Sequence, residues 1–148
     1  MSAIDRLAVE LSEPVRRLGV RGWDVERLRA LLSRVEIRAW RVEASDAPGL
    51  WHGRCPLGSG QALVAWQRAP LGVPERGAFL VARSLPVGPE RYLLLGRPVV
   101  VPPRRAGSFE RLLGSLRAPR AEFWRVHGGV IARVARGWAP SGPAIRAA

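Results

Sequence analysis

The sequence is poor in residues that form crosslinks or bind metals, with one cysteine, Cys55, and two histidines among 148 residues. A single cysteine cannot form an internal disulfide, and one thiolate with two imidazoles cannot complete a structural zinc site. There is no apolar run of about 18 residues, the length of a membrane-spanning helix, and the N-terminus lacks the pattern of a signal peptide. We therefore expect a soluble, cytoplasmic protein without disulfides or bound metal.

Lysine, asparagine and threonine are absent altogether, so all 24 basic residues are arginines. Without lysine there is no Walker A phosphate loop, no Schiff-base chemistry and no kinase-type lysine, because each needs an ammonium group on a flexible chain. The scarcity of thermolabile side chains is typical of heat-adapted proteins and predicts a thermophile. GC-rich codons would produce the same bias.

Sequence motifs for catalysis are missing as well. Gly-x-Ser-x-Gly, His-Glu-x-x-His and Gly-x-Gly-x-x-Gly do not occur, and His52 and His127 are the only histidines. Asp5, Asp24 and Asp46 are scattered along the chain, which disfavours a metal-dependent nuclease built from clustered carboxylates. We expect a protein that is not an enzyme and that uses no cofactor.

Positive charge dominates the sequence, with a formal net charge of +12, and it is unevenly distributed. Residues 1–50 carry nine arginines against eight acidic residues, whereas residues 51–148 carry fifteen arginines against four. Counterions released from phosphates drive the binding of such chains to polyanions, so nucleic acid is the expected partner. The first third then serves as scaffold and the rest as the binding face. The alternative is a basic protein with a solvated arginine surface.

Apolar residues at helical spacing predict a helical layer over residues 1–34. The pattern gives a first helix at 3–11, a short second helix that ends at Gly19, and a third helix from the capping residue Asp24 to about Ser33. The segment that follows changes to a period of two residues, which is typical of strands.

Segment 35–103 is predicted to form a four-stranded antiparallel meander with proline-rich loops. The strands are residues 35–40, 50–55, 61–68 and 78–85, and short apolar pieces follow at 92–95 and 99–101. Two C-terminal helices over 108–137 begin near Ser108 and Pro119, and a frayed tail follows at 140–148. The sequence thus predicts one α+β domain over 1–148, with a helical N-terminal layer, a small antiparallel sheet and C-terminal helices.

The candidate binding site combines aromatic rings and arginines at strand spacing. Because residues two apart lie on one face of a strand, Arg38 lies beside Trp40. Rings on which bases stack, with cations for the phosphates between them, are what a surface for single-stranded nucleic acid needs. The residues predicted to bind nucleic acid are Arg38, Trp40, Trp51, Arg54, Trp66, Arg68, Phe79, Arg83, Tyr92, Arg104 and Arg105. The alternative is that the tryptophans belong to the core and the arginines are charges at strand ends.

A second interpretation of the N-terminal third is a helix-turn-helix regulator that binds duplex DNA. Residues 14–34 show its apolar spacing, with Gly19 in the turn and Val25 six residues later. The recognition helix would begin with Asp24 and Glu26, however, and those carboxylates would face phosphates and base edges. The predicted function is therefore sequence-nonspecific binding of single-stranded DNA, or of RNA, since stacking and phosphate contacts are common to both.

The layout of opening helices, a small sheet and a leucine-bearing C-terminal helix resembles the ThermoDBP group, single-stranded DNA-binding proteins of hyperthermophilic archaea. The residues that carry the resemblance are Trp40, Trp51 and Trp66 among Arg38, Arg54 and Arg68, together with Leu112, Leu113 and Leu116. The resemblance implies nonspecific binding of single strands in a cleft between sheet and helices, and a homo-oligomer formed through the C-terminal helices. The sequence departs from the group in lacking a long heptad zipper, because the leucines stop at Leu116.

Overall fold

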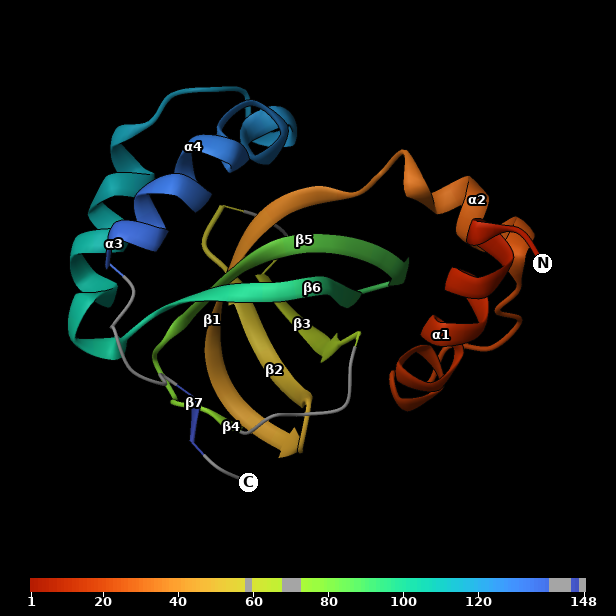
Figure 1. The fold of residues 1–148 in the computed structure, drawn as a ribbon. Helices are drawn as coiled ribbons and strands as arrows, with labels where there is room; N and C mark the ends of the chain where they lie inside the picture. Colours follow the sequence, from red (N-terminus) through yellow and green to blue (C-terminus); the bar gives the residue numbers. More distant parts are fainter. Residues whose placement is uncertain (58–59, 68–72, 139–144, 147–148) are drawn as a thin grey trace.

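The computed structural model describes residues 1–57, 60–67, 73–138 and 145–146, and a β-barrel lies at its centre (Figure 1). One pair of helices lies on each side of the barrel (Figure 1). The N-terminal pair is α1 (Ala3–Arg17) and α2 (Val25–Leu32), and the C-terminal pair is α3 (Pro103–Ser115) and α4 (Phe123–Trp138).

Five strands form the closed barrel. In chain order they are β1 (Glu36–Ala47), β2 (Leu50–Cys55), β3 (Gly60–Trp66), β5 (Phe79–Gly88) and β6 (Arg91–Val101). Antiparallel ladders join β1 to β2, β2 to β3, β1 to β5 and β5 to β6, and a parallel ladder joins β3 to β6. A separate two-stranded ladder pairs β4 (Val73–Pro74) with β7 (Ile145–Arg146), which lies within the predicted tail.

The predicted four-stranded meander is wrong, because the chain closes into a barrel of five strands. The apolar pieces at 92–95 and 99–101 belong to one strand, β6, which continues through Gly96 at a φ of 74°. Side-chain-bearing residues rarely adopt that φ, so Gly96 permits an irregularity inside a continuous strand where the sequence suggested a break. The register of β6 against β5 shifts in this region, between Val81 and Arg83 of β5.

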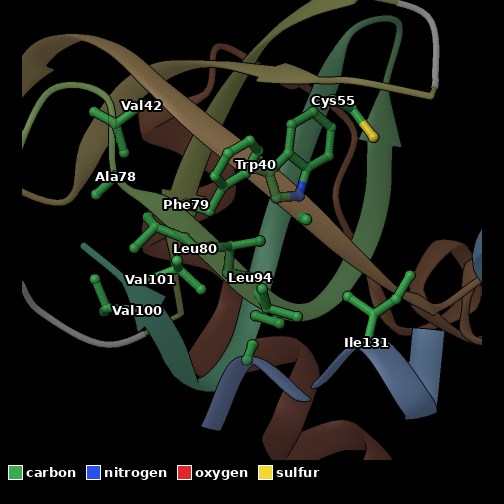
Figure 2. Packing of buried hydrophobic residues seen from close by; sticks show 14 of the residues in the cluster. Trp40, Val42, Cys55, Ala78, Phe79, Leu80, Leu94, Val100, Val101 and Ile131 are labelled. Atoms are coloured by element: carbon green, nitrogen blue, oxygen red, sulfur yellow. The ribbon is translucent and has the colours of Figure 1, made fainter. Parts of the chain in front are cut away.

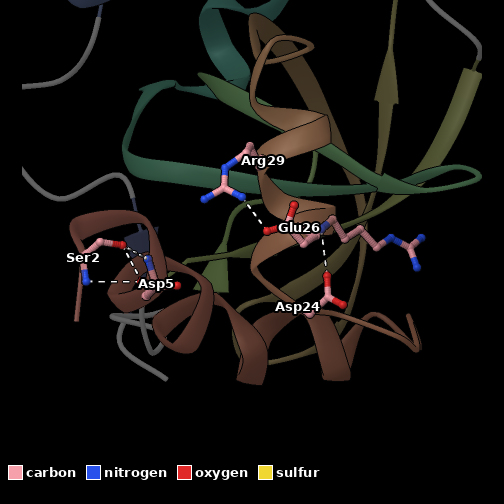
Figure 3. Close-up of polar contacts among 6 residues, drawn as sticks. Ser2, Asp5, Asp24, Glu26 and Arg29 are labelled. Atoms are coloured by element: carbon pink, nitrogen blue, oxygen red, sulfur yellow. Dashed lines mark hydrogen bonds and ion pairs between the residues drawn. The ribbon is translucent and has the colours of Figure 1, made fainter.

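Two helices rather than three open the chain. The predicted break after residue 11 is wrong, because α1 continues through Pro14. Leu11, Pro14 and Val15 are all buried, so packing on the barrel outweighs the backbone hydrogen bond that proline removes. The predicted helix after Asp24 is confirmed as α2, and the Asp24 carboxylate accepts a hydrogen bond from the Arg27 backbone N–H (Figure 3).

The C-terminal helices are confirmed with one shifted boundary. α3 begins at Pro103 rather than near Ser108. Proline suits the first helical position, because a backbone N–H there would have no acceptor within the helix. After Pro119 a short 3-10 helix, η1 (Arg120–Glu122), leads directly into α4.

Large side chains fill the interior of the barrel. Trp40 lies in one buried cluster with Leu80 and Leu94 (Figure 2). Its indole N–H donates to the Ser84 hydroxyl at 3.0 Å, and that hydroxyl donates in turn to the carbonyl of Ala82. A barrel of this size has room only for side chains, so its inward positions are core.

The helices cover two parts of the barrel exterior. α1 and α2 lie over the row of residues Leu50, Ala65, Leu93 and Leu85, which are neighbours across β2, β3, β6 and β5. α3 and α4 lie over β1, β5 and β6, where Ala39, Val81 and Val99 are neighbours. The outward residues His52 and Arg54 of β2 and Gln61 of β3 lie beyond these two groups, are exposed, and are not covered by any of the described helices.

Two neighbouring glycines of α4 give a test of how this helix is seated. A Cβ added at Gly128 would lie 2.9 Å from the backbone oxygen of Ile37, whereas one added at Gly129 would have no neighbour within 4 Å. We expect Gly128→Ala to lower the free energy of unfolding by about 1–3 kcal/mol. Gly129→Ala, the matched control, is expected to raise it by up to about 1 kcal/mol, because alanine favours the helix. Urea unfolding measures both, and two stabilised variants would contradict the close contact of α4 with β1.

Candidate nucleic-acid interface

The aromatic residues predicted to stack on bases lie in the core instead. Trp40, Trp51 and Phe79 have no exposed surface, and Trp66 is 5% exposed. The rings of Trp51 and Trp66 meet edge to face, with centroids 5.3 Å apart. Their assignment as stacking surfaces is therefore wrong for the folded protein. Period-two spacing identifies which residues share a face, but here the shared face of the tryptophans is the barrel interior.

Arg38 and Tyr92 lie together at the rim of the barrel interior. The Arg38 guanidinium is 5.1 Å from the centre of the Tyr92 ring, and its Nε donates to Glu36 at 2.8 Å. Burial opposes the charge of Arg38, but Tyr92, Cys55 and Glu36 outweigh it, so the pKa of the guanidinium lies above its ordinary value. Arg38 thus satisfies its charge within the fold and is not presented to a ligand.

Cys55 points into the same region, and its thiol is not activated as a nucleophile. Burial raises the pKa of its thiol to about 11, against a weaker opposing effect of Arg38. The thiol is therefore protonated at neutral pH, and a thiol is a poor nucleophile compared with a thiolate. Over the residues that the structure describes, no group of three or more metal-binding side chains occurs, and no helix is long and apolar enough to span a membrane.

The uncovered side of the barrel carries polar and basic residues in two rows across the strands. In the first row, Arg41 of β1 lies opposite Arg54 of β2, and Arg54 lies opposite Gln61 of β3. In the second row, His52 of β2 and Arg91 of β6 flank Leu63 of β3, which packs against the cluster beneath α1 and α2, so this row borders the covered part of the barrel. We call the outward residues Arg41, His52, Arg54, Gln61 and Arg91 the open face. Three guanidinium groups therefore lie within a few strand spacings of each other.

A groove lies at one edge of the open face, between β1 and the start of α3. Its volume is about 380 Å³, and its lining includes Arg41, Glu43, Arg76, Gly77 and Pro103. Two of these residues are arginines, and Arg76 is exposed. The groove thus extends the basic surface from the strands toward α3.

The remaining predicted site residues are dispersed. Arg54 belongs to the open face, and Arg104 and Arg105 are exposed in the first turn of α3, next to the groove residue Pro103. Arg83 is exposed on β5, opposite Ile37 of β1 and away from β2 and β3. Arg68 lies outside the described residues. The structure therefore brings part of the predicted arginine set near one surface, while the predicted rings lie inside the barrel or, for Phe79, between the barrel and α3.

The predicted sites did not include several residues of this surface, among them Arg41, Arg76 and Arg91. The signal that would have found Arg41 is parity. Because neighbours in a strand point to opposite sides, an inward Trp40 requires an outward Arg41. Arg91 enters through the parallel pairing of β3 with β6, which no local pattern shows.

The C-terminal helices form a second region rich in positive charge. Segment 103–138 has eight exposed arginines against two glutamates, Glu110 and Glu122. The apolar stripe expected to mediate self-association packs mainly on the barrel, because Phe109, Leu113 and Phe123 are buried. Val126 and Val130, one turn apart on α4, remain exposed, and arginines share this surface of the helix. The predicted homo-oligomer stays a prediction.

Residues 14–34 show no feature that favours a duplex-reading helix. α1 and α2 are separated by residues 18–24, and α2 packs on the barrel, where Arg27 donates to the carbonyl of Val87. At the start of α2, Asp24 is engaged as the N-cap and Glu26 pairs with Arg29 (Figure 3). The acidic start of this helix is therefore part of its own capping and ion pairing.

No protein-family model, no curated protein and no solved structure matches this chain. Function is therefore inferred from the geometry of the open face and its groove.

Proposed function

We propose that the protein binds single-stranded nucleic acid, DNA in the first place, without sequence preference and across the open face. The observation that carries the proposal is the facing pair of arginines, Arg41 and Arg54, whose side chains are 43% and 53% exposed on the outward side of the barrel. The strand would continue along the groove past Arg76. Guanidinium groups bind phosphate oxygens in a planar, two-pronged geometry, so such a row fits a phosphodiester backbone.

The architecture supports single strands as the ligand. Five-stranded Greek-key barrels of the oligonucleotide-binding type take their ligands on strands two and three and on the adjoining loops. Four of the five open-face residues lie on the first three strands of a five-stranded barrel here, and Arg91 lies on the neighbouring strand β6. Because one architecture hosts many functions, the chemical basis of the proposal is the arginines of the open face.

The buried tryptophans change the expected source of affinity. With Trp40, Trp51 and Trp66 in the core, His52 is the aromatic ring that the open face offers to a base. Phosphate contacts therefore dominate the free energy of binding. Such contacts carry no sequence information, which is consistent with nonspecific binding.

Competition binding among single-stranded DNA, single-stranded RNA and duplex DNA at matched salt tests the proposal. We expect single strands to bind best, and the double variant Arg54→Gln/Arg76→Gln to weaken binding about tenfold or more. Arg6→Gln/Arg34→Gln is the matched control, because it removes the same charge from exposed positions at the N-terminal helices.

Three outcomes would contradict the proposal. Equal losses in both double variants would assign binding to the overall charge rather than to the open face. A preference for duplex DNA would contradict the choice of ligand, and the absence of binding to all three probes would end the proposal.

A further inference from the structure

We propose that Glu43 and Glu110 act as built-in competitors of the nucleic acid: they hold the two central arginines of the open face in the free protein and are displaced by phosphates on binding. This inference rests on the proposed function and adds two residues that set its affinity. They act on the ligand through the arginines.

The geometry matches each arginine with its own carboxylate. Arg54 donates from Nε to Glu43 at 3.1 Å, and Arg41 donates to Glu110 at 2.8 Å. Glu43 comes from β1 and Glu110 from α3, so two different elements supply the carboxylates. Both pairs lie on the outside of the barrel, where a ligand can reach them.

The pairing explains how two arginines can lie directly opposite each other. Like charges at opposed positions of an antiparallel pair destabilise a sheet, and Arg41 and Arg54 occupy such positions. Glu110 and Glu43 neutralise the repulsion in the free protein. A phosphodiester backbone brings several negative charges together and can take over that role.

The ion pairs are exposed enough to be exchanged. The exposed fractions of the four side chains lie between 30% and 53%, and ion pairs at such exposure contribute little to folding stability. A carboxylate can therefore leave its arginine without unfolding the protein. A single anion displaces one carboxylate at a time, whereas a strand that engages one arginine holds its next phosphate beside the second. The arrangement thus favours phosphate polymers over isolated anions.

Neutralising the carboxylates one at a time tests the inference. We expect Glu43→Gln and Glu110→Gln each to bind an oligothymidine about two- to fivefold more tightly than the original protein in fluorescence anisotropy. Glu26→Gln is the matched control, because Glu26 also pairs with an arginine, Arg29, but on α2 (Figure 3). Its affinity is expected to change by less than either.

A double-mutant cycle gives the sharper readout. If Glu43 acts by occupying Arg54, Glu43→Gln has no effect in the background of Arg54→Gln. Unfolding midpoints of the single glutamate variants are expected within about 3 °C of the original, which separates the effect from a change in fold.

The outcomes distinguish this inference from the proposed function. If the original protein does not bind single strands, the proposed function fails first. If it binds and Glu43→Gln gains no more than Glu26→Gln, only long-range charge matters and the inference is overturned. If Glu43→Gln weakens binding, the carboxylate positions the arginine for the phosphate instead of competing with it, which also overturns the inference.

Discussion

Trp66→Ala is expected to lower the free energy of unfolding by about 3–5 kcal/mol while the folded protein keeps its affinity for single strands. The side chain is 5% exposed and meets Trp51 edge to face inside the barrel. Truncation removes this contact and leaves a cavity that the surrounding side chains of a closed barrel cannot readily fill. Urea unfolding followed by circular dichroism measures the loss.

Trp66→Phe is the control for shape and polarity. The Trp66 indole N–H has no hydrogen-bond partner within the described structure, so phenylalanine loses no hydrogen bond there and keeps most of the apolar volume. We expect a smaller loss of stability than for alanine. Binding is measured at a temperature where each variant is folded. An alanine variant as stable as the original but weaker in binding would contradict the core position and restore Trp66 as a stacking surface.

The sequence predicted the elements of this fold better than their assembly. Helical spacing found α2, α3 and α4, and alternation found β1, β2, β3 and β5, because both patterns are local. Barrel closure depends on pairing β3 with β6 across about 30 residues of chain, and no local pattern reports such a pairing. Gly96 and Pro98 also interrupt the apolar pattern of β6, so the sequence predicts two fragments instead of one strand.

The candidate site shows the same division between local and nonlocal information. Charge composition predicts a polyanionic ligand and shows that the excess of arginine lies in the C-terminal two thirds of the chain. Alternation correctly placed Arg38 and Trp40 on one side of β1, but it could not tell which side is the interior. An arginine among indoles is typical of a surface, whereas in this fold Glu36 and Tyr92 accommodate Arg38 at the rim of the barrel. Because Trp40 points into the barrel, the outward residue at this place in β1 is its neighbour Arg41.

The affinity for single strands is expected to fall steeply with salt, because arginines supply most of the binding free energy. If Arg41, Arg54, Arg76 and Arg91 each neutralise one phosphate, the slope of log K against log salt is about −2.8. Affinity then falls about 50-fold between 50 and 200 mM salt. Anisotropy titrations of an oligothymidine over this range measure the slope.

The same titration on Arg54→Gln/Arg76→Gln separates local phosphate contacts from the general field of a basic protein. Removing two of four contacts is expected to flatten the slope to about −1.4, so affinity falls only about sevenfold over the same range. In Arg6→Gln/Arg34→Gln the slope is expected to stay near that of the original protein. A slope near zero in the original would show that phosphates are not the ligand. A slope that both double variants leave unchanged would place the phosphate contacts elsewhere, with the exposed arginines of α3 and α4 as the next surface to neutralise, because they carry the largest excess of positive charge among the described helices.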